Sequence, residues 1–190
     1  MVYLAWRTLP SGGIGLKYFV FLKGVNVGST TKVDMKAVQA ALEAKGIEAA
    51  TFLNSGNVMV DGIRSAGDAE KAVREAVLEV SGLEVAAIVR TPSQVKASLA
   101  ESPFSGRSYD QSHALIYFGE RRFDVDNAKS LGQIKGSVEE YQCEKDALHV
   151  HYPDGIGRSK FTTSWIDKAF GLKTTGRNLE TLRRMMERFG

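Results

Sequence analysis

The sequence predicts an α+β fold in which two ferredoxin-like (βαββαβ) subdomains follow one another in tandem, with a C-terminal helix after them. The order strand, helix, strand, strand, helix, strand occurs twice along the 190 residues, and a linking helix separates the two runs. With 43% hydrophobic residues, a chain of this length can bury a sizeable core without disulfides. The predicted parts are an irregular extension (1–17), a first subdomain (18–90), a linking helix and loop (91–111), and a second subdomain with the C-terminal helix (112–190).

The first subdomain is predicted from apolar runs, helical spacing and turn residues. Its opening run is rich in aromatic and β-branched residues, which is typical of a buried strand, and Asp34 is a typical helix N-cap. Asn54-Ser55-Gly56 favours a hairpin turn between two short strands. The predicted elements are, in order, a strand at 18–27, a helix that ends at Gly46, strands at 49–53 and 57–61, a helix that ends at Gly82, and a strand at 84–90.

The second subdomain repeats this order after the linking helix. Thr91 and Gln94 fit a capping box, and Pro92 occupies the first helical position. The predicted elements that follow are a strand at 113–119, a helix at 125–134, hairpin strands at 139–143 and 148–152, a helix at 159–170, a strand at 172–175, and a last helix capped by Asn178.

Both faces of the first strand are apolar. Val20 and Leu22 alternate with Phe19 and Phe21, whereas a ferredoxin-like sheet carries helices on one face only. An exposed apolar sheet face would be a liability. The open faces are therefore expected to be covered either by the other subdomain or by a second chain, as in a homodimer.

Charge and cysteine content narrow the class of protein. Residues 156–190 hold 8 basic and 3 acidic side chains, a net charge of +5 (8 − 3) against +3 for the whole chain. Such a basic end attracts anions, although a solvated helix face has the same composition. A single cysteine, Cys143, excludes an internal disulfide, so the cytoplasm is the expected compartment. No apolar run approaches the ~20 residues that span a bilayer, and residues 1–17 lack a signal-peptide pattern, so we expect no membrane partner.

Two segments of the second subdomain bring cations to predicted helix starts. After the strand that ends near Tyr152, a loop with two glycines leads to Arg158, Ser159 and Lys160. Free amides at a helix N-terminus favour an anion, which Arg158 would hold with two donors and Lys160 as a point charge. Arg177 precedes Asn178 at another helix start, where a cation is unfavourable unless an anion answers it. Ordinary helix caps explain the same residues without a ligand.

Two loops of the first subdomain complete the candidate site. Lys23 and Asn26 lie in a stretch with two glycines, whose backbone amides can approach an anion. Asn57 follows the hairpin turn, so the side chains of Asn26 and Asn57 could meet at one edge of the sheet. A plain tight turn explains both loops equally well.

Catalysis and metal binding are not indicated. His149 and His151 share one face of a strand and His113 begins another, but none has a clear carboxylate partner for a metal. Cys143 could act as a nucleophile with His149 or His151 opposite it, although a lone strand cysteine usually packs as a small hydrophobe. We predict neither a metal nor a cofactor, and whether the protein is an enzyme stays open.

Four segments, taken together, resemble a known family. They are Gly24–Gly28, Asn54–Val58, Tyr152–Lys160 and Thr175–Asn178, in this order and at this spacing. They look like the hallmark segments of the bacterial family called domain of unknown function 1697 (DUF1697). The resemblance covers residues 18–189 and implies a pair of ferredoxin-like subdomains, but no activity or cofactor.

The leading hypothesis is a cytosolic protein that binds a phosphorylated or other anionic small molecule, with Arg158, Lys160 and Arg177 converging on one pocket. The full set of candidate ligand-binding residues is Lys23, Asn26, Asn57, Arg158, Ser159, Lys160, Arg177 and Asn178. One alternative is a nucleic-acid-binding protein that uses the basic C-terminal region. Another is a non-catalytic interaction protein that uses an apolar sheet face.

Overall fold

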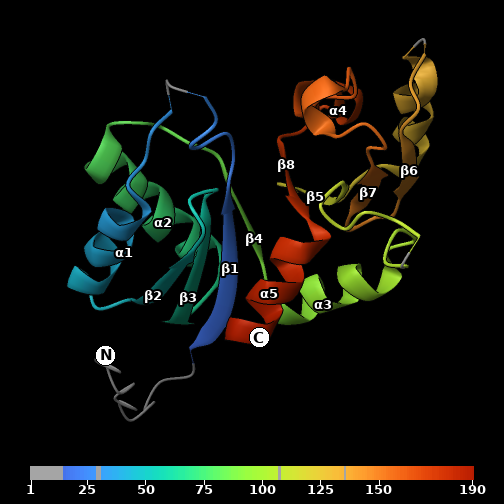
Figure 1. Ribbon diagram of the computed structural model, residues 1–190. Coiled ribbons are helices and arrows are strands. Elements are labelled where there is room, and N and C mark those ends of the chain that lie inside the picture. The colour runs from blue at the N-terminus through green and yellow to red at the C-terminus, as the bar shows by residue number, and fades with distance from the viewer. Residues whose placement is uncertain (1–14, 29–30, 107, 135) are drawn as a thin grey trace, which may run out of the picture.

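The computed structural model describes residues 15–28, 31–106, 108–134 and 136–190. It shows an α+β fold with two four-stranded antiparallel sheets and helices (Figure 1). Residues 1–14, the greater part of the predicted extension, lie outside the described residues. Leu16 and Lys17 belong to the first strand rather than to the extension.

The first sheet has the strand order β2-β3-β1-β4. Its half of the chain contains β1 (Leu16–Leu22), α1 (Met35–Ala44), β2 (Glu48–Phe52), β3 (Asn57–Ile63), α2 (Ala66–Ser81) and β4 (Ala87–Arg90). Asp34 caps α1 as predicted, because its carboxylate accepts hydrogen bonds from the main-chain N–H groups of Lys36 and Ala37. Both helices pack on the face that carries Val20 and Leu22, where they share one apolar core with the sheet.

The second sheet has the corresponding order β6-β7-β5-β8. The remaining elements are α3 (Pro92–Glu101), β5 (Ala114–Gly119), the 3₁₀ helix η1 (Val125–Gln133), β6 (Glu140–Cys143), β7 (Leu148–His151), the 3₁₀ turn η2 (Ile156–Arg158), α4 (Thr163–Phe170), β8 (Thr174–Asn178) and α5 (Leu179–Phe189). Thr91 and Gln94 form the predicted capping box of α3. One face of this sheet packs against η1 and α4 in a core that includes Tyr117 and Leu148.

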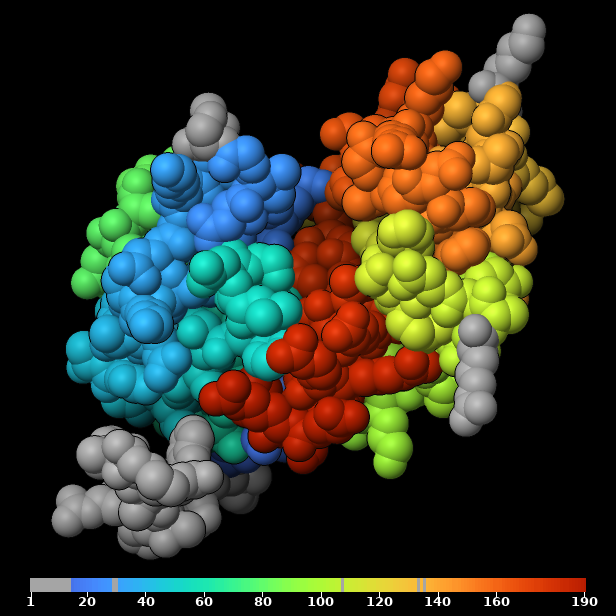
Figure 2. All heavy atoms as spheres, in the orientation of Figure 1, coloured from blue at the N-terminus to red at the C-terminus, as the bar shows by residue number. Residues whose placement is uncertain are grey.

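The other faces of the two sheets meet in a shared core between the halves. Phe19 and Phe21 of β1 lie in it, and the ring of Phe21 stacks on Phe118 of β5 with 5.3 Å between centroids. α3 and α5 pack into the same core through residues such as Val95 and Leu182. In Figure 2 the C-terminal segment (red) fills the surface between the first half (blue to green) and the second (yellow to orange). The halves thus cover each other's open faces, which confirms the first of the two alternatives drawn from the sequence.

One predicted helix boundary is wrong in a way that affects the candidate site. The helix expected at 159–170 begins only at Thr163, and Thr162 is its N-cap. The side chain of Phe161 is fully buried, and its main-chain N–H and C=O bond to Ser159 Oγ at 2.8 Å and Tyr152 Oη at 3.0 Å. These bonds keep the segment before Thr162 out of the helix, and Ser159 has an extended backbone. Other differences are the 3₁₀ form of the helix expected at 125–134, the start of β4 at 87, and the shift of the last strand to 174–178.

Candidate functional site

Arg177 lies in β8 between the two halves, and every donor of its guanidinium is used internally. The side chain is 8% exposed, and burial lowers its pKa to about 10. Its acceptors are the side-chain oxygens of Asn57 and Thr175 and the main-chain oxygens of Leu22, Ser55, Gly56 and Gly176. The sequence indicated no partner for this cation, and the structure shows that oxygen atoms of the protein itself bind it. Arg177 thereby links β8 to the ends of β1 and β3.

Lys23 makes a second polar link between the halves. Its Nζ lies 2.7 Å from Asp167 Oδ2 and donates to the main-chain oxygen of Thr174 at 2.8 Å. Asp167 in turn accepts hydrogen bonds from the main-chain N–H and the hydroxyl of Thr174. Like Arg177, Lys23 makes its polar contacts with other residues of the chain.

The three candidate asparagines shape the local backbone. Asn26 has a positive φ of 56°, and its amide bonds both main-chain groups of Val33 and the main-chain oxygen of Asn54, at 2.6 to 3.0 Å. Asn57 donates to the main-chain oxygen of Phe52 as well as accepting from Arg177. Asn178 caps α5, as predicted. Asn26 and Asn57 do not bond each other.

Arg158, Ser159 and Lys160 line a cavity of about 330 Å³ between the loop that precedes β6 and the segment that follows β7. Asp154 and Glu139 also line it. Among the described residues, neither Arg158 nor Lys160 has an ion-pair partner within 4 Å. Because α4 begins only at Thr163, these residues do not lie at its N-terminus, and that part of the prediction is wrong.

Glu139 organises one wall of this cavity. Its carboxylate accepts hydrogen bonds from the hydroxyls of Ser137 and Ser159 and from the main-chain N–H of Val138. Burial of the carboxyl opposes its ionisation, but the hydrogen bonds outweigh burial and leave the pKa of Glu139 below its ordinary value. Glu139 is therefore ionised at neutral pH, and it holds Ser159 in place.

The structure thus divides the candidate residues between separate places. Arg158, Ser159 and Lys160 share the 330 Å³ cavity, whereas Arg177 does not line it and is enclosed between the halves with Asn57. The position of Arg177 in the chain drew attention to it, but its acceptors Asn57 and Gly56 lie 120 and 121 residues away in sequence, so no local pattern could identify them.

His149 and Cys143 do not form a pair. Cys143 is opposite Leu148 in the hairpin and packs in the core beside η1 and α4, whereas His149 is opposite Gln142 and Ile116 and so faces the other side of the sheet. Burial, with the carboxylates of nearby acids, raises the pKa of the Cys143 thiol to about 11. This overturns the nucleophile alternative, because the thiol is neither beside the imidazole nor ionised.

His149 has an environment that the sequence analysis did not foresee. Its side chain is completely buried, and neither ring nitrogen has a hydrogen-bond partner among the described residues. Burial lowers the pKa of His149 to about 4. Nothing in the sequence distinguishes it from His151 two residues later, whose side chain is 12% exposed.

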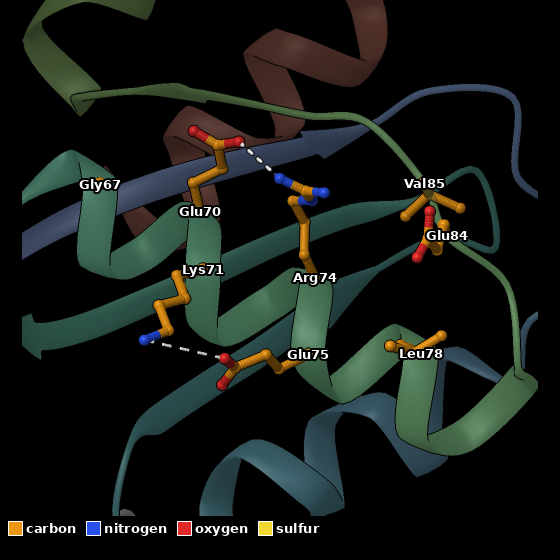
Figure 3. Close-up of a pocket in the computed structure, with 8 residues that line it drawn as sticks. All are labelled: Gly67, Glu70, Lys71, Arg74, Glu75, Leu78, Glu84 and Val85. Carbon is orange, nitrogen blue, oxygen red and sulfur yellow. Dashed lines mark hydrogen bonds and ion pairs between the residues drawn. The ribbon is translucent and has the colours of Figure 1, made fainter.

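A second hollow, of about 380 Å³, contains none of the candidate residues. It lies between α2 and the segment that leads into β4, and Figure 3 shows the residues that line it. The ion pairs Glu70–Arg74 (3.4 Å) and Lys71–Glu75 (3.9 Å) run along α2 at this hollow. The i, i+4 spacing of these charges was the only local signal, and it indicates an ordinary solvated helix face.

Two searches of the described part of the chain gave negative results. No group of three or more histidine, cysteine, aspartate or glutamate side chains there is arranged to hold a metal ion. No helix there combines the length and the apolar character that a membrane crossing requires.

The observed architecture defines an α+β protein of two antiparallel sheets that share one core and are fastened by a buried arginine. The sequence profile of the family described as "Protein of unknown function (DUF1697)" matches residues 16–149, and the chain belongs to this family. The conserved bacterial protein SP0830 from Streptococcus pneumoniae is similar in structure, with a TM-score of 0.65 and 20% sequence identity over 91% of this chain and 98% of that chain. At this identity the likeness shows the fold alone. No curated protein matches the chain.

Proposed function

We propose that this protein binds an anionic small molecule, such as a phosphorylated metabolite, in the 330 Å³ cavity that Arg158, Ser159 and Lys160 line. The observation that carries the proposal is the contrast among the cations. Lys23 and Arg177 are neutralised or fully bonded within the chain, whereas Arg158 and Lys160 line a cavity without an ion-pair partner among the described residues. Arginine and lysine together suit a phosphate or carboxylate.

The remaining residues of the cavity limit the ligand. Asp154 and Glu139 contribute carboxylates, so a ligand must place its anionic group on the side of Arg158 and Lys160. The hydroxyl of Ser159 donates to Glu139 and accepts from the N–H of Phe161, so its main role is to fix the local backbone. Asn26, Asn57, Asn178, Lys23 and Arg177 would support the fold around the site rather than touch the ligand.

Thermal denaturation in the presence of inorganic phosphate, pyrophosphate and nucleoside phosphates tests this proposal. A ligand at about 100 times its Kd should raise Tm by about 5–10 °C for a chain of this size. Arg158→Ala and Lys160→Ala should abolish most of the shift. Lys145→Ala, which removes an exposed cation from the β6–β7 turn, should leave it unchanged. No shift with any compound, or an equal shift in Arg158→Ala, would refute the proposal.

No observation favours the nucleic-acid alternative over this one. Among the arginines of α5, Arg183 donates to Gln111 Oε1 at 2.7 Å, and Arg184 lies over the ring of Phe52, 5.3 Å from its centroid. These contacts within the protein engage part of the basic charge that suggested nucleic-acid binding. Binding to mixed-sequence RNA or DNA with a steep salt dependence would nevertheless restore that alternative.

We further propose that each half is a ferredoxin-like subdomain and that the boundary lies within residues 91–111. The first half has the β-α-β-β-α-β order, and the second half has the same order with the 3₁₀ helix η1 in place of its first α-helix. The matching strand orders β2-β3-β1-β4 and β6-β7-β5-β8 and the capped helix α3 between the halves add support. A cytoplasmic location is also a proposal, based on the single cysteine. Fractionation of cells that express the tagged protein would test it.

A further inference from the structure

The strand β4 leaves one of its edges without a neighbour. β4 pairs only with β1, so it forms one margin of the first sheet. Lys23 N–H bonds Ala86 at 2.8 Å, whereas the N–H of Leu22, which is opposite Ala87, bonds Gly56 in the other direction. Leu22 and Ala87 are therefore a non-hydrogen-bonded pair of the antiparallel ladder. The main-chain N–H and C=O of Ala87 consequently point away from β1.

These main-chain groups of Ala87 are enclosed but unpaired. The residue is 6% exposed, yet neither group has a hydrogen-bond partner among the described residues. Val89 is the next residue with the same orientation, and its carbonyl already accepts from Arg90, whose guanidinium also reaches Gly119 at 2.9 Å. The unpaired edge thus runs through Ala87 to the N–H of Val89. Buried main-chain groups are normally paired with protein or with water, and these groups line a hollow, so they are available to pair with an added strand.

Two connected hollows lie along this edge. The larger, of about 380 Å³, is the one in Figure 3, between α2 and the segment of Glu84 and Val85. The smaller, of about 180 Å³, is lined by residues 86–88 on one side and by Glu120 and Lys173 of the second half on the other. Both share Glu70, Arg74, Glu84 and Val85 as lining residues. We call the two together the β4 groove.

The side chains of the β4 groove determine what it can accept. Leu78 is 45% exposed and, with Val85, offers an apolar contact on the α2 side. The charges of α2 are paired along the helix, but Glu84 and Glu120 have no ion-pair partner within 4 Å among the described residues. Lys173 is the one cation left opposite them in the smaller hollow. Across the groove, four carboxylates face three cations, so basic groups are favoured over acidic ones.

We propose that the β4 groove binds an extended, basic segment of a partner protein, which adds to β4 as a further antiparallel or parallel strand. Ala87 would exchange two main-chain hydrogen bonds with it, and the N–H of Val89 would donate a third. Successive side chains of the added strand point to opposite faces. One set would therefore be apolar and rest on Leu78 and Val85, and the other would be basic and reach Glu120. This surface is separate from the anion cavity and does not depend on it.

Nuclear magnetic resonance of the ¹⁵N-labelled full chain tests the proposal. The probe is an acetylated and amidated pentapeptide that alternates lysine and valine, and its controls are a version N-methylated at both valines and a version with glutamate in place of lysine. The lysine–valine peptide should shift the amide signals of Ala87 and Val89 and slow their hydrogen exchange at least tenfold at saturation. Both controls should bind at least tenfold more weakly, because N-methylation removes the valine N–H donors and places methyl groups at the strand edge, and the glutamate version is repelled by Glu84 and Glu120.

Charge reversal supplies a matched comparison that does not alter the strand. Glu84→Lys and Glu120→Lys should each weaken the lysine–valine peptide at least fivefold. Glu101→Lys, the same change at an exposed position of α3, should not. Equal binding of the N-methylated peptide, or unchanged Ala87 and Val89 signals at millimolar peptide, would overturn the proposal. So would protection of both amides without peptide in a dimer detected by light scattering, since the edge would then be occupied by a second copy.

Discussion

The buried imidazole of His149 predicts a specific dependence of stability on pH. Its pKa is about 4 in the folded protein, lowered by burial from the ordinary 6.5, although the carboxylate of Glu144 acts in the opposite direction. Between these two values the unfolded chain binds more protons than the folded one. Stability from this residue is therefore complete above pH 6.5 and is lost as pH falls toward 4.

The size of the effect follows from the two pKa values. At pH 5 the unfolded imidazole is almost fully protonated and the folded one almost fully neutral, which corresponds to a loss of about 2 kcal/mol relative to pH 7.5. His149→Leu removes the titration. Because neither ring nitrogen has a partner among the described residues, the substitution gives up no hydrogen bond and should change stability at pH 7.5 by less than about 1.5 kcal/mol.

Urea denaturation of the wild type and His149→Leu at pH 7.5 and pH 5.0 measures this difference. The carboxyl groups titrate in both proteins and cancel in the comparison, so the variant should lose about 2 kcal/mol less than the wild type. Val27→Ala is the control, since this exposed side chain carries no titratable group and should leave the pH dependence unchanged. Parallel pH profiles for the wild type and His149→Leu, or an NMR titration of His149 near 6.5, would refute the reasoning.

Three further predictions concern the links that build the fold, and urea denaturation measures each. Arg177→Lys should lower the free energy of unfolding by about 2–4 kcal/mol, because a lysine has three N–H donors where the guanidinium has five. Retention of full stability would contradict the role given to the guanidinium. Gly176→Ala should cost about 1–3 kcal/mol, since an added Cβ would lie 2.8 Å from the ring of Tyr117, and Gly176→Ala combined with Tyr117→Leu should recover part of the loss. Asn178→Ala should cost about 1 kcal/mol through loss of the α5 cap, whereas Asn178→Asp should cost little.

Local patterns predicted most of the fold. The N-caps at Asp34, Thr91 and Asn178 are properties of a few neighbouring residues, and the structure has all three. The alternation of Phe19 and Phe21 with Val20 and Leu22 also predicted that β1 is buried on both faces, because side chains of a strand alternate between faces.

The sequence-based predictions fail where residues that are distant in sequence determine the local structure. The stretch before α4 has turn and cap residues, but the buried ring of Phe161 and the hydroxyl of Tyr152 keep it out of the helix. The site prediction placed Arg177 with Arg158 because both are cations near helix starts. Its acceptors at Asn57 and Gly56 become visible only when the two halves are together, and no spacing within one segment reports on them.

The position of α5 has a consequence for the order in which the protein can mature on the ribosome. Phe19 and Phe21 are made early, but the helix that seals them against water, with Leu182 and Phe189, is made more than 150 residues later. Even Lys17, at the start of β1, donates to the main-chain oxygen of Phe189 at 2.8 Å. The apolar face of the first half therefore lacks the cover of α5 until residues 179–189 have been synthesised.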